Sequence, residues 1–238
     1  KLSHILFTLR PSSGLDYAPT EILLNFSAEA VRRIGGHVTS PTSDAATLTR
    51  MDDTVGGGWW RHFYDGSFDK EQAETEVVKG YIDRLGVGAR MNMFAVPAKR
   101  ELSHRPLYYL VFGTRHPQGA WFFGDAVARS TSTWRDAIES RTSGAQLFLE
   151  GMGMTASEQQ QKLEDDASDA IAQNLIALLA TRGNLIVGDY PLNVFGDYFG
   201  LATEKVVRRA IKELHKQGLI SSTGVGERID QLEVTRPT

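Results

Sequence analysis

Residues 203–218 have the sequence TEKVVRRAIKELHKQG, and this stretch decides the fold of the C-terminal third. Val207, Ala210, Ile211 and Leu214 recur at positions i, i+3, i+4 and i+7, which places them on one face of a helix. Thr203 is a favourable N-cap and Gly218 is a typical helix terminator. The spacing therefore predicts a helix over residues 203–217 with one buried apolar face.

The segments around this helix follow the order of a winged helix-turn-helix domain. A helix is predicted over 170–181, a short strand over 185–187 and a second short helix over 193–199. Gly200-Leu201-Ala202 forms the turn before the helix over 203–217. Residues 219–223 and 229–234 are predicted strands, and the glycine-containing segment 224–228 joins them as the tip of a wing. We therefore expect a winged helix-turn-helix domain over residues 169–238.

The exposed face of the helix over 203–217 is predicted to be basic. Five positive side chains and two negative ones give this segment a local charge of +3. Such a helix in a major groove, with a wing that reaches phosphates, is a common way to bind DNA. The candidate nucleic-acid-binding residues are Lys205, Arg208, Arg209, Lys212, Lys216 and the wing residue Arg228. The alternative is a solvated charged face, because residues 168–238 contain eight basic and eight acidic residues.

The first two thirds of the chain predict an α/β domain over residues 1–154. Short apolar β-rich runs alternate there with helical patterns, which is typical of α/β folds. The interval 37–58 is predicted to be a long surface loop or a short irregular helix. The last two strands are expected to form an antiparallel hairpin at a sheet edge. The predicted strands are Ile5–Leu9, Glu21–Phe26, Met91–Val96 and Leu107–Thr114, and the predicted helices are Ala28–Ile34, Asp69–Leu85 and Trp121–Ser130.

A linker is predicted between the two domains, over residues 155–168. This segment is polar and nearly lacks apolar periodicity, and it follows the Gly-Met-Gly-Met sequence at 151–154. Both properties are typical of the boundary between two domains.

Composition excludes several classes of site. The chain contains no cysteine, so it forms no disulfide and supplies no thiolate to zinc or to an iron–sulfur cluster. Its six histidines are scattered without metal-ligand spacing, and we expect no metal site. The net charge of −3 confines any contact with nucleic acid to a local patch. The apolar runs are too short to span a membrane and no signal peptide is evident, so a cytoplasmic protein is expected.

Three other features of the sequence are candidate sites. The triplet Gly56-Gly57-Gly58 and the pair Gly86 and Gly88 lack the spacing of a phosphate-binding loop, and loop flexibility is the favoured interpretation. The aromatic cluster 59–64 could stack on bases or on a partner, but packing of a helix on the sheet is favoured.

The chain starts at Lys1 with a strand-like run, so we expect the sequence to begin inside a domain.

Two stretches resemble the three-Cys-motif partner protein (TcmP) family. They are TEILLNFSAEAVRR at 20–33 and LYYLVFGTRHPQG at 107–119, and the segment Lys212-Glu213-Leu214 also has counterparts there. The resemblance spans about residues 14–217. It implies a methyltransferase-like, Rossmann-like domain, S-adenosylmethionine as a cofactor and a three-cysteine, radical-SAM-like protein as a partner. The chain departs from the family because it lacks the Phe-x-Asp-x-Phe-Ala-Gly-Pro-Gly-like stretch that would hold the cofactor. Two explanations stay open: residues 9–16 are a divergent version of that stretch, or residues are missing there and the domain is incomplete at its N-terminus.

Three functional hypotheses follow. The first is a nucleic-acid-binding accessory protein that contacts DNA and acts with the radical-SAM-like partner. The second is an S-adenosylmethionine-dependent methyltransferase with Asn25 and the turn Thr114-Arg115-His116-Pro117 near its site. The third is a protein-interaction scaffold in which the aromatic cluster and the winged helix bind the partner. Catalytic and cofactor-binding residues are not identified.

Overall fold

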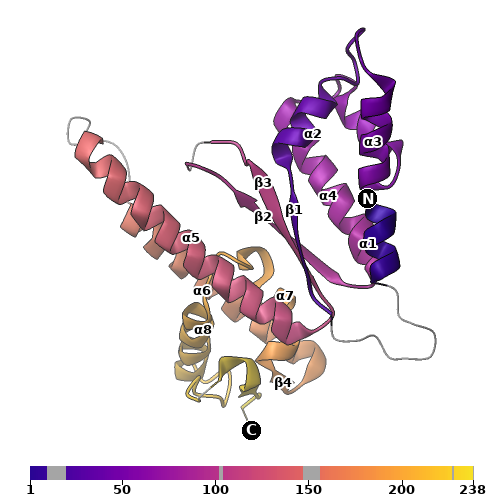
Figure 1. Cartoon of the computed structure of the whole chain (residues 1–238). Coiled ribbons are helices and arrows are strands. Elements are labelled where there is room, and N and C mark those ends of the chain that lie inside the picture. The colour runs from indigo at the N-terminus through magenta and orange to yellow at the C-terminus, as the bar shows by residue number, and fades with distance from the viewer. Residues whose placement is uncertain (10–19, 102–103, 147–155, 227, 238) are drawn as a thin grey trace. The chain divides into compact units, whose positions relative to one another are not determined.

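The computed structural model describes residues 1–9, 20–101, 104–146, 156–226 and 228–237 (Figure 1). The chain divides into two compact units, Lys1–Arg115 and His116–Thr238. The division therefore falls ahead of residue 117 and not at the predicted linker over 155–168. The physical reason is that the long helix α5, Pro117–Gln146, packs within the second unit.

The first unit contains a three-stranded sheet with β3 in the centre. The strands β1 (Ile22–Phe26), β2 (Asn92–Ala98) and β3 (Tyr108–Thr114) have the order β1-β3-β2. Both neighbours run antiparallel to β3, with Leu24 and Ala95 each opposite Val111. The predicted β2–β3 hairpin is confirmed. A Rossmann-like sheet consists mostly of parallel neighbours, whereas the two ladders of this described sheet are antiparallel.

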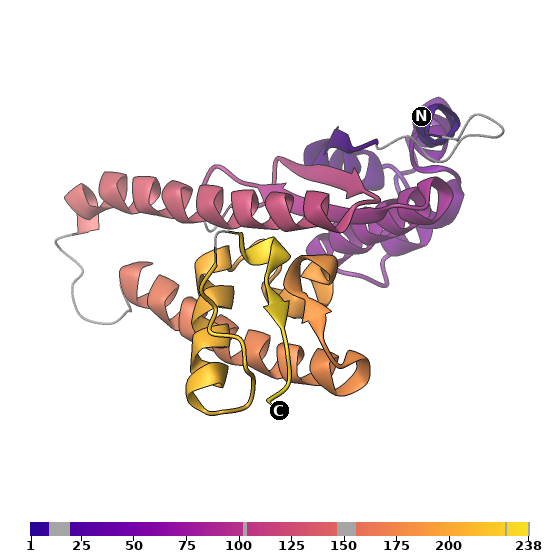
Figure 2. The same ribbon diagram turned by 90° about the horizontal axis from the view of Figure 1, so that it is seen from below.

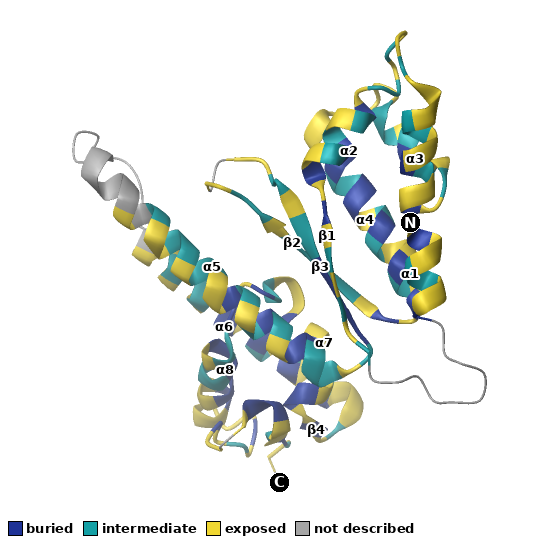
Figure 3. Ribbon diagram, viewed as in Figure 1, coloured by how far each residue is buried: buried dark blue, intermediate teal, exposed yellow. Residues whose placement is uncertain are grey.

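Helices lie on one side of this sheet (Figure 1). Buried side chains of α4 (Lys70–Ala89), among them Val77 and Leu85, pack with Val31, Val55 and Trp60 in one core. Figure 3 shows buried positions along α4 and exposed positions along α3 (Ala45–Val55). The elements are α1 (Leu2–Thr8), α2 (Ala28–Gly35), α3 (Ala45–Val55), the 3-10 helix η1 (Gly58–Tyr64) and α4 (Lys70–Ala89).

Two predictions for this unit were wrong. Residues 5–8 lie in α1 and not in a strand, because Leu2, Ile5, Leu6 and Leu9 form an i, i+3, i+4, i+7 stripe that packs on the core. The interval 37–58 contains the regular helix α3, which was predicted at most as a short irregular one. The side chain of Asp44 caps the start of α3 by accepting a bond from Ala46 N, and Gly56 ends it with a φ of 83°.

The second unit is built on α6 (Ala156–Arg182), against which α7 (Pro191–Phe195) and α8 (Glu204–Lys216) pack (Figure 2). The short strands β4 (Leu185–Ile186) and β5 (Glu233–Val234) pair antiparallel, with Leu185 opposite Val234. Ile171, Leu175, Phe195, Ile211 and Ile229 lie in the core. The other elements are the 3-10 helices η2 (Val187–Asp189), η3 (Gly196–Tyr198) and η4 (Ile229–Gln231), with α7 (Pro191–Phe195) and α8 (Glu204–Lys216).

The predicted linker is wrong in this unit, because residues 156–168 form the first half of α6. Its Gln, Glu, Lys and Ala residues are good helix formers, so a polar sequence can still be helical when only a few positions are buried. Ala167 and Ser168 are those buried positions. Within the described parts of both units, no helix is both long enough and apolar enough to cross a membrane.

Candidate nucleic-acid interface

The helix α8 has the buried stripe that the sequence predicts. Val207, Ala210, Ile211 and Leu214 are all buried in the core of the second unit. Thr203 occupies the N-cap position, but its side chain makes no capping bond. Instead, Asp125 of α5 accepts a bond from the Glu204 N–H at 2.9 Å. The sequence analysis missed this cap because it comes from a helix that is 79 residues distant along the chain.

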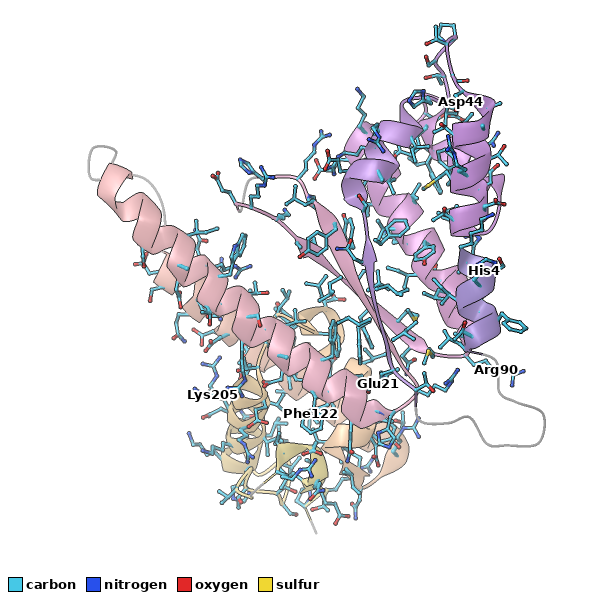
Figure 4. The ribbon with its side chains drawn as sticks, in the orientation of Figure 1. His4, Glu21, Asp44, Arg90, Phe122 and Lys205 are labelled. Carbon is cyan, nitrogen blue, oxygen red and sulfur yellow. The ribbon has the colours of Figure 1, made fainter. Side chains whose placement is uncertain are left out.

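Two of the six predicted basic residues are exposed and without a partner. Lys205 and Lys212 lie on the solvent face of α8, seven positions apart, and neither makes an ion pair or a side-chain hydrogen bond with any described residue. Figure 4 shows Lys205 projecting from the helix. Both ammonium groups are therefore available to an anionic ligand.

Arg208 fixes the predicted wing segment to α8. Its Nη1 atom donates to the main-chain oxygens of Gly224 and Gly226, both at 3.1 Å. Gly224 is buried against α8 with a φ of 72°, and a Cβ there would lie 3.1 Å from Ile211 Cγ2. Residues 224–226 of the predicted wing therefore lie close to α8, and Val225 between the two glycines is exposed.

Arg209 fixes α8 to α6. One terminal nitrogen donates to the main-chain oxygen of Glu164, and the other forms an ion pair with Asp165 at 3.0 Å. The side chain of Arg209 is 35% exposed and that of Asp165 is 56% exposed. This ion pair lies at the surface, where solvent screens it.

The remaining two basic residues also have partners. Lys216 pairs with Glu213 at 2.6 Å, within one turn of α8. Arg228 forms two bonds with Asp230, at 3.1 and 2.6 Å, and the Asp230 side chain is only 4% exposed. Arg228 thus neutralises a buried carboxylate, which argues for a structural role.

The wing differs from the prediction. Residues 219–223 do not form a regular strand, and residues 229–231 form the 3-10 helix η4. The two arms are joined by Ser221 N–H to Thr235 O at 3.0 Å and by Ser222 Oγ to Glu233 O at 2.7 Å. Serine hydroxyls here replace some of the backbone hydrogen bonds of a regular strand pair. For this reason the strand predicted over residues 219–223 does not form.

The residues proposed for a methyltransferase site are not brought together. Asn25 lies opposite Leu110, while Thr114 lies four residues further along β3, about 13 Å away at the usual rise of a strand. Arg115 Nη2 donates to the main-chain oxygens of Leu9 and Ala89, at the C-terminal ends of α1 and α4. Cations at helix C-termini are stabilising, so Arg115 has a structural role.

A buried polar cluster in the first unit was not predicted. Glu74 of α4 is 3% exposed and accepts bonds from Arg32 Nη1 at 2.5 Å and from the Tyr109 hydroxyl at 3.1 Å. Burial and the charge of Glu74 raise the pKa of the Tyr109 hydroxyl, and the same causes raise the pKa of Tyr64 to about 12. The signal for this cluster was a glutamate at an apolar position, four residues before Val78.

The aromatic cluster 59–64 packs mainly inward, in line with the packing role that the sequence analysis favoured. Trp60 is fully buried and donates to Asp52 at 2.8 Å. Trp59 lies between Gly80, where a Cβ would approach its ring to 2.4 Å, and the Arg84 guanidinium, 3.8 Å from the ring centroid. The rings therefore fasten η1 to α4.

Comparisons with protein-family models, with curated proteins and with solved structures each gave no match. Among the residues that the structure describes, no group of three or more His, Asp or Glu side chains is arranged to hold a metal ion.

Proposed function

We propose that the second unit is a winged-helix module that binds the phosphate backbone of duplex DNA through α8. The observation that carries this proposal is the exposure of Lys205 and Lys212 on one face of α8, without an acidic partner among the described residues. A lysine ammonium is a compact point charge that suits phosphate oxygens. Contacts to phosphates position a protein on a duplex without reading its sequence.

The order of the elements supports this interpretation. The sequence α6, β4, α7, α8, then two extended arms of which the second contains β5, is the order of helices and strands in winged-helix modules. The strand β5 pairs with β4 and is also bonded to the arm at 221–222, as in a small three-stranded sheet. In this arrangement α8 corresponds to the helix that enters the major groove.

The partners of the arginines favour backbone binding over reading of bases. Specific recognition of guanine usually takes an arginine that is free to make two bonds to one base. Arg208 and Arg209 are instead held by the wing and by α6. The module is therefore proposed to bind duplexes of different sequence with similar affinity.

A fluorescence anisotropy titration of the whole chain tests the proposal. The probes are labelled duplexes of two helical turns with unrelated sequences, titrated over a series of salt concentrations. We expect similar affinities for all duplexes and a linear fall of log K with log salt. No binding at low salt, or binding that salt does not weaken, contradicts the proposal.

The topology of the first unit favours a second, architectural proposal. Because β1 and β2 are both antiparallel to β3, they run parallel to each other, and the segment with α2, α3 and α4 joins them across β3. Open α/β sheets often contain one antiparallel strand among parallel ones. We interpret the unit as the edge of a Rossmann-like, methyltransferase-like sheet of the TcmP type.

The described residues do not fit S-adenosylmethionine. Dinucleotide-like cofactors sit on a glycine-rich turn between a parallel strand and a helix. The corresponding turn here is Asn25-Phe26-Ser27, in which Ser27 accepts a bond from Ala30 N and caps α2 itself. Calorimetry with S-adenosylmethionine is therefore expected to give no binding heat.

The proposed radical-SAM-like partner is tested separately. If the resemblance to the TcmP family extends to its association with a three-cysteine protein, the chain should co-purify with the product of such a neighbouring gene after nuclease treatment. Loss of the complex on nuclease treatment would instead point to a bridge made by DNA.

A further inference from the structure

Three cations of α8 are neighbours on its surface, and one of them pairs with a carboxylate of α6. Arg209 lies four residues after Lys205 and three residues before Lys212, and side chains at these spacings are neighbours on a helix surface. Among the described residues, Asp165 of α6 is the one acidic group that forms an ion pair with any of the three. Of these three cations, Arg209 is thus the one with an ion-pair partner among the described residues, and that partner comes from another helix.

The position of this carboxylate is set by α6. Arg209 is anchored through its second terminal nitrogen to the main-chain oxygen of Glu164, so its guanidinium stays at the surface of α6 without Asp165. Asp165 Oδ1 also accepts a bond from Gln161 at 2.9 Å, one turn earlier in α6. More than half of its side chain is exposed, so the carboxylate can leave the guanidinium without a change in the fold.

Carboxylates and phosphates bind a guanidinium in the same way. Both present two oxygens to its planar fork of N–H donors, and both are favoured by further cations nearby. Lys205 and Lys212 provide those cations, whereas neither of them contacts Asp165. The charges therefore favour a ligand with more negative charge than one carboxylate.

We propose that Asp165 occupies the place of a DNA phosphate on Arg209, and that the phosphate displaces it on binding. This inference rests on the proposed function and names Lys205, Arg209 and Lys212 as one phosphate site. Asp165 competes with the ligand and lowers its affinity. Removal of its charge should therefore strengthen binding, which is opposite to the usual effect of removing a side chain that makes a contact.

The test is Asp165→Asn, with Asp166→Asn as a matched control. Asp166 is exposed at the next position of α6 and makes no ion pair with Arg209. Its replacement by asparagine therefore removes the same charge without breaking that pair. Asp165→Asn should bind the labelled duplex about two- to fivefold more tightly, the range expected for release of an exposed ion pair. Its salt dependence should stay the same, because Arg209 contacts phosphate in both complexes once Asp165 has been displaced. Asp166→Asn should change the affinity less.

The double variant Asp165→Asn/Arg209→Gln should lose the gain in affinity, and its salt dependence should be shallower by about 0.9 because one phosphate contact is lost. Thermal unfolding of each variant checks that the fold is kept. If Lys205→Gln weakens binding while Asp165→Asn binds as the unaltered chain does, the inference is wrong and the proposed function stands. If the unaltered chain does not bind duplex DNA at all, the proposed function itself is wrong.

Discussion

Asp125 Oδ1 accepts a hydrogen bond from the main-chain N–H of Glu204 at 2.9 Å, and Oδ2 of the same carboxylate pairs with Arg129 at 2.5 Å. A carboxylate of α5 thus accepts a hydrogen bond from a free main-chain N–H in the first turn of α8. The side chain at a helix's own N-cap position usually accepts such a bond. The side chain of Asp125 is 16% exposed, so water replaces it poorly. The helix α5 is therefore a structural part of the proposed winged-helix module.

Replacement of Asp125 by alanine should destabilise the second unit by about 1–2 kcal/mol, the typical cost of a lost helix cap. Urea unfolding followed by circular dichroism measures this change. Asp136→Ala is the matched control, because Asp136 is an exposed aspartate of the same helix. Equal stabilities of the two variants would show that the contact with Glu204 contributes nothing.

The variant Lys205→Gln/Lys212→Gln should weaken binding to duplex DNA and reduce its salt dependence. Each phosphate contact contributes about 0.9 to the slope of log K against log salt, so the loss of two contacts should lower the slope by about 1.8. Lys70→Gln removes an equivalent charge from α4 of the first unit and serves as the control. An unchanged slope in the double variant excludes both lysines from the interface.

Arg208→Gln should release the wing from α8. The bonds to Gly224 O and Gly226 O are lost, so the amide of Val225 and its neighbours should exchange hydrogen faster in NMR or mass spectrometry. Lys212→Gln is the control, since it alters the charge of α8 without a bond to the wing. If wing exchange is the same in both variants, Arg208 does not hold the wing.

Tyr64→Phe should leave stability at neutral pH unchanged or slightly higher. The buried Tyr64 hydroxyl has no hydrogen-bond partner among the described residues, so its removal breaks no bond. Chemical denaturation at pH 7 checks this expectation. Tyr108→Phe, at the exposed start of β3, controls for the general effect of losing a hydroxyl.

The same tyrosine predicts a loss of stability in alkali. Burial and Glu74 raise the pKa of Tyr64 from 10.0 to about 12, so the unfolded chain ionises before the folded one. The contribution of the raised pKa of Tyr64 to the free energy of unfolding is therefore complete below pH 10 and is lost as the pH rises towards 12. The free energy of unfolding of Tyr64→Phe should fall less over this interval. An identical fall in both proteins would contradict the raised pKa.

The sequence alone determined the elements whose signals are local. The stripe of α8 and the β2–β3 hairpin follow from apolar spacing within a few residues, and both lie where they were predicted. The wrong prediction of a strand at α1 also came from a local signal, because a seven-residue apolar helix and a strand have similar composition. The spacing of Leu2, Ile5, Leu6 and Leu9 indicates a helix, whereas the apolar composition of the segment does not distinguish a helix from a strand.

Only the tertiary structure decided which basic side chains are available. Arg209 meets Glu164 across 45 positions of the chain, and Arg208 meets the wing across 16 and 18 positions. A sequence pattern shows that a cation lies on the polar face of a helix, but its partner depends on which other element packs beside that face. For this reason periodicity identified all the cations of α8, whereas packing separated Lys205 and Lys212 from the arginines.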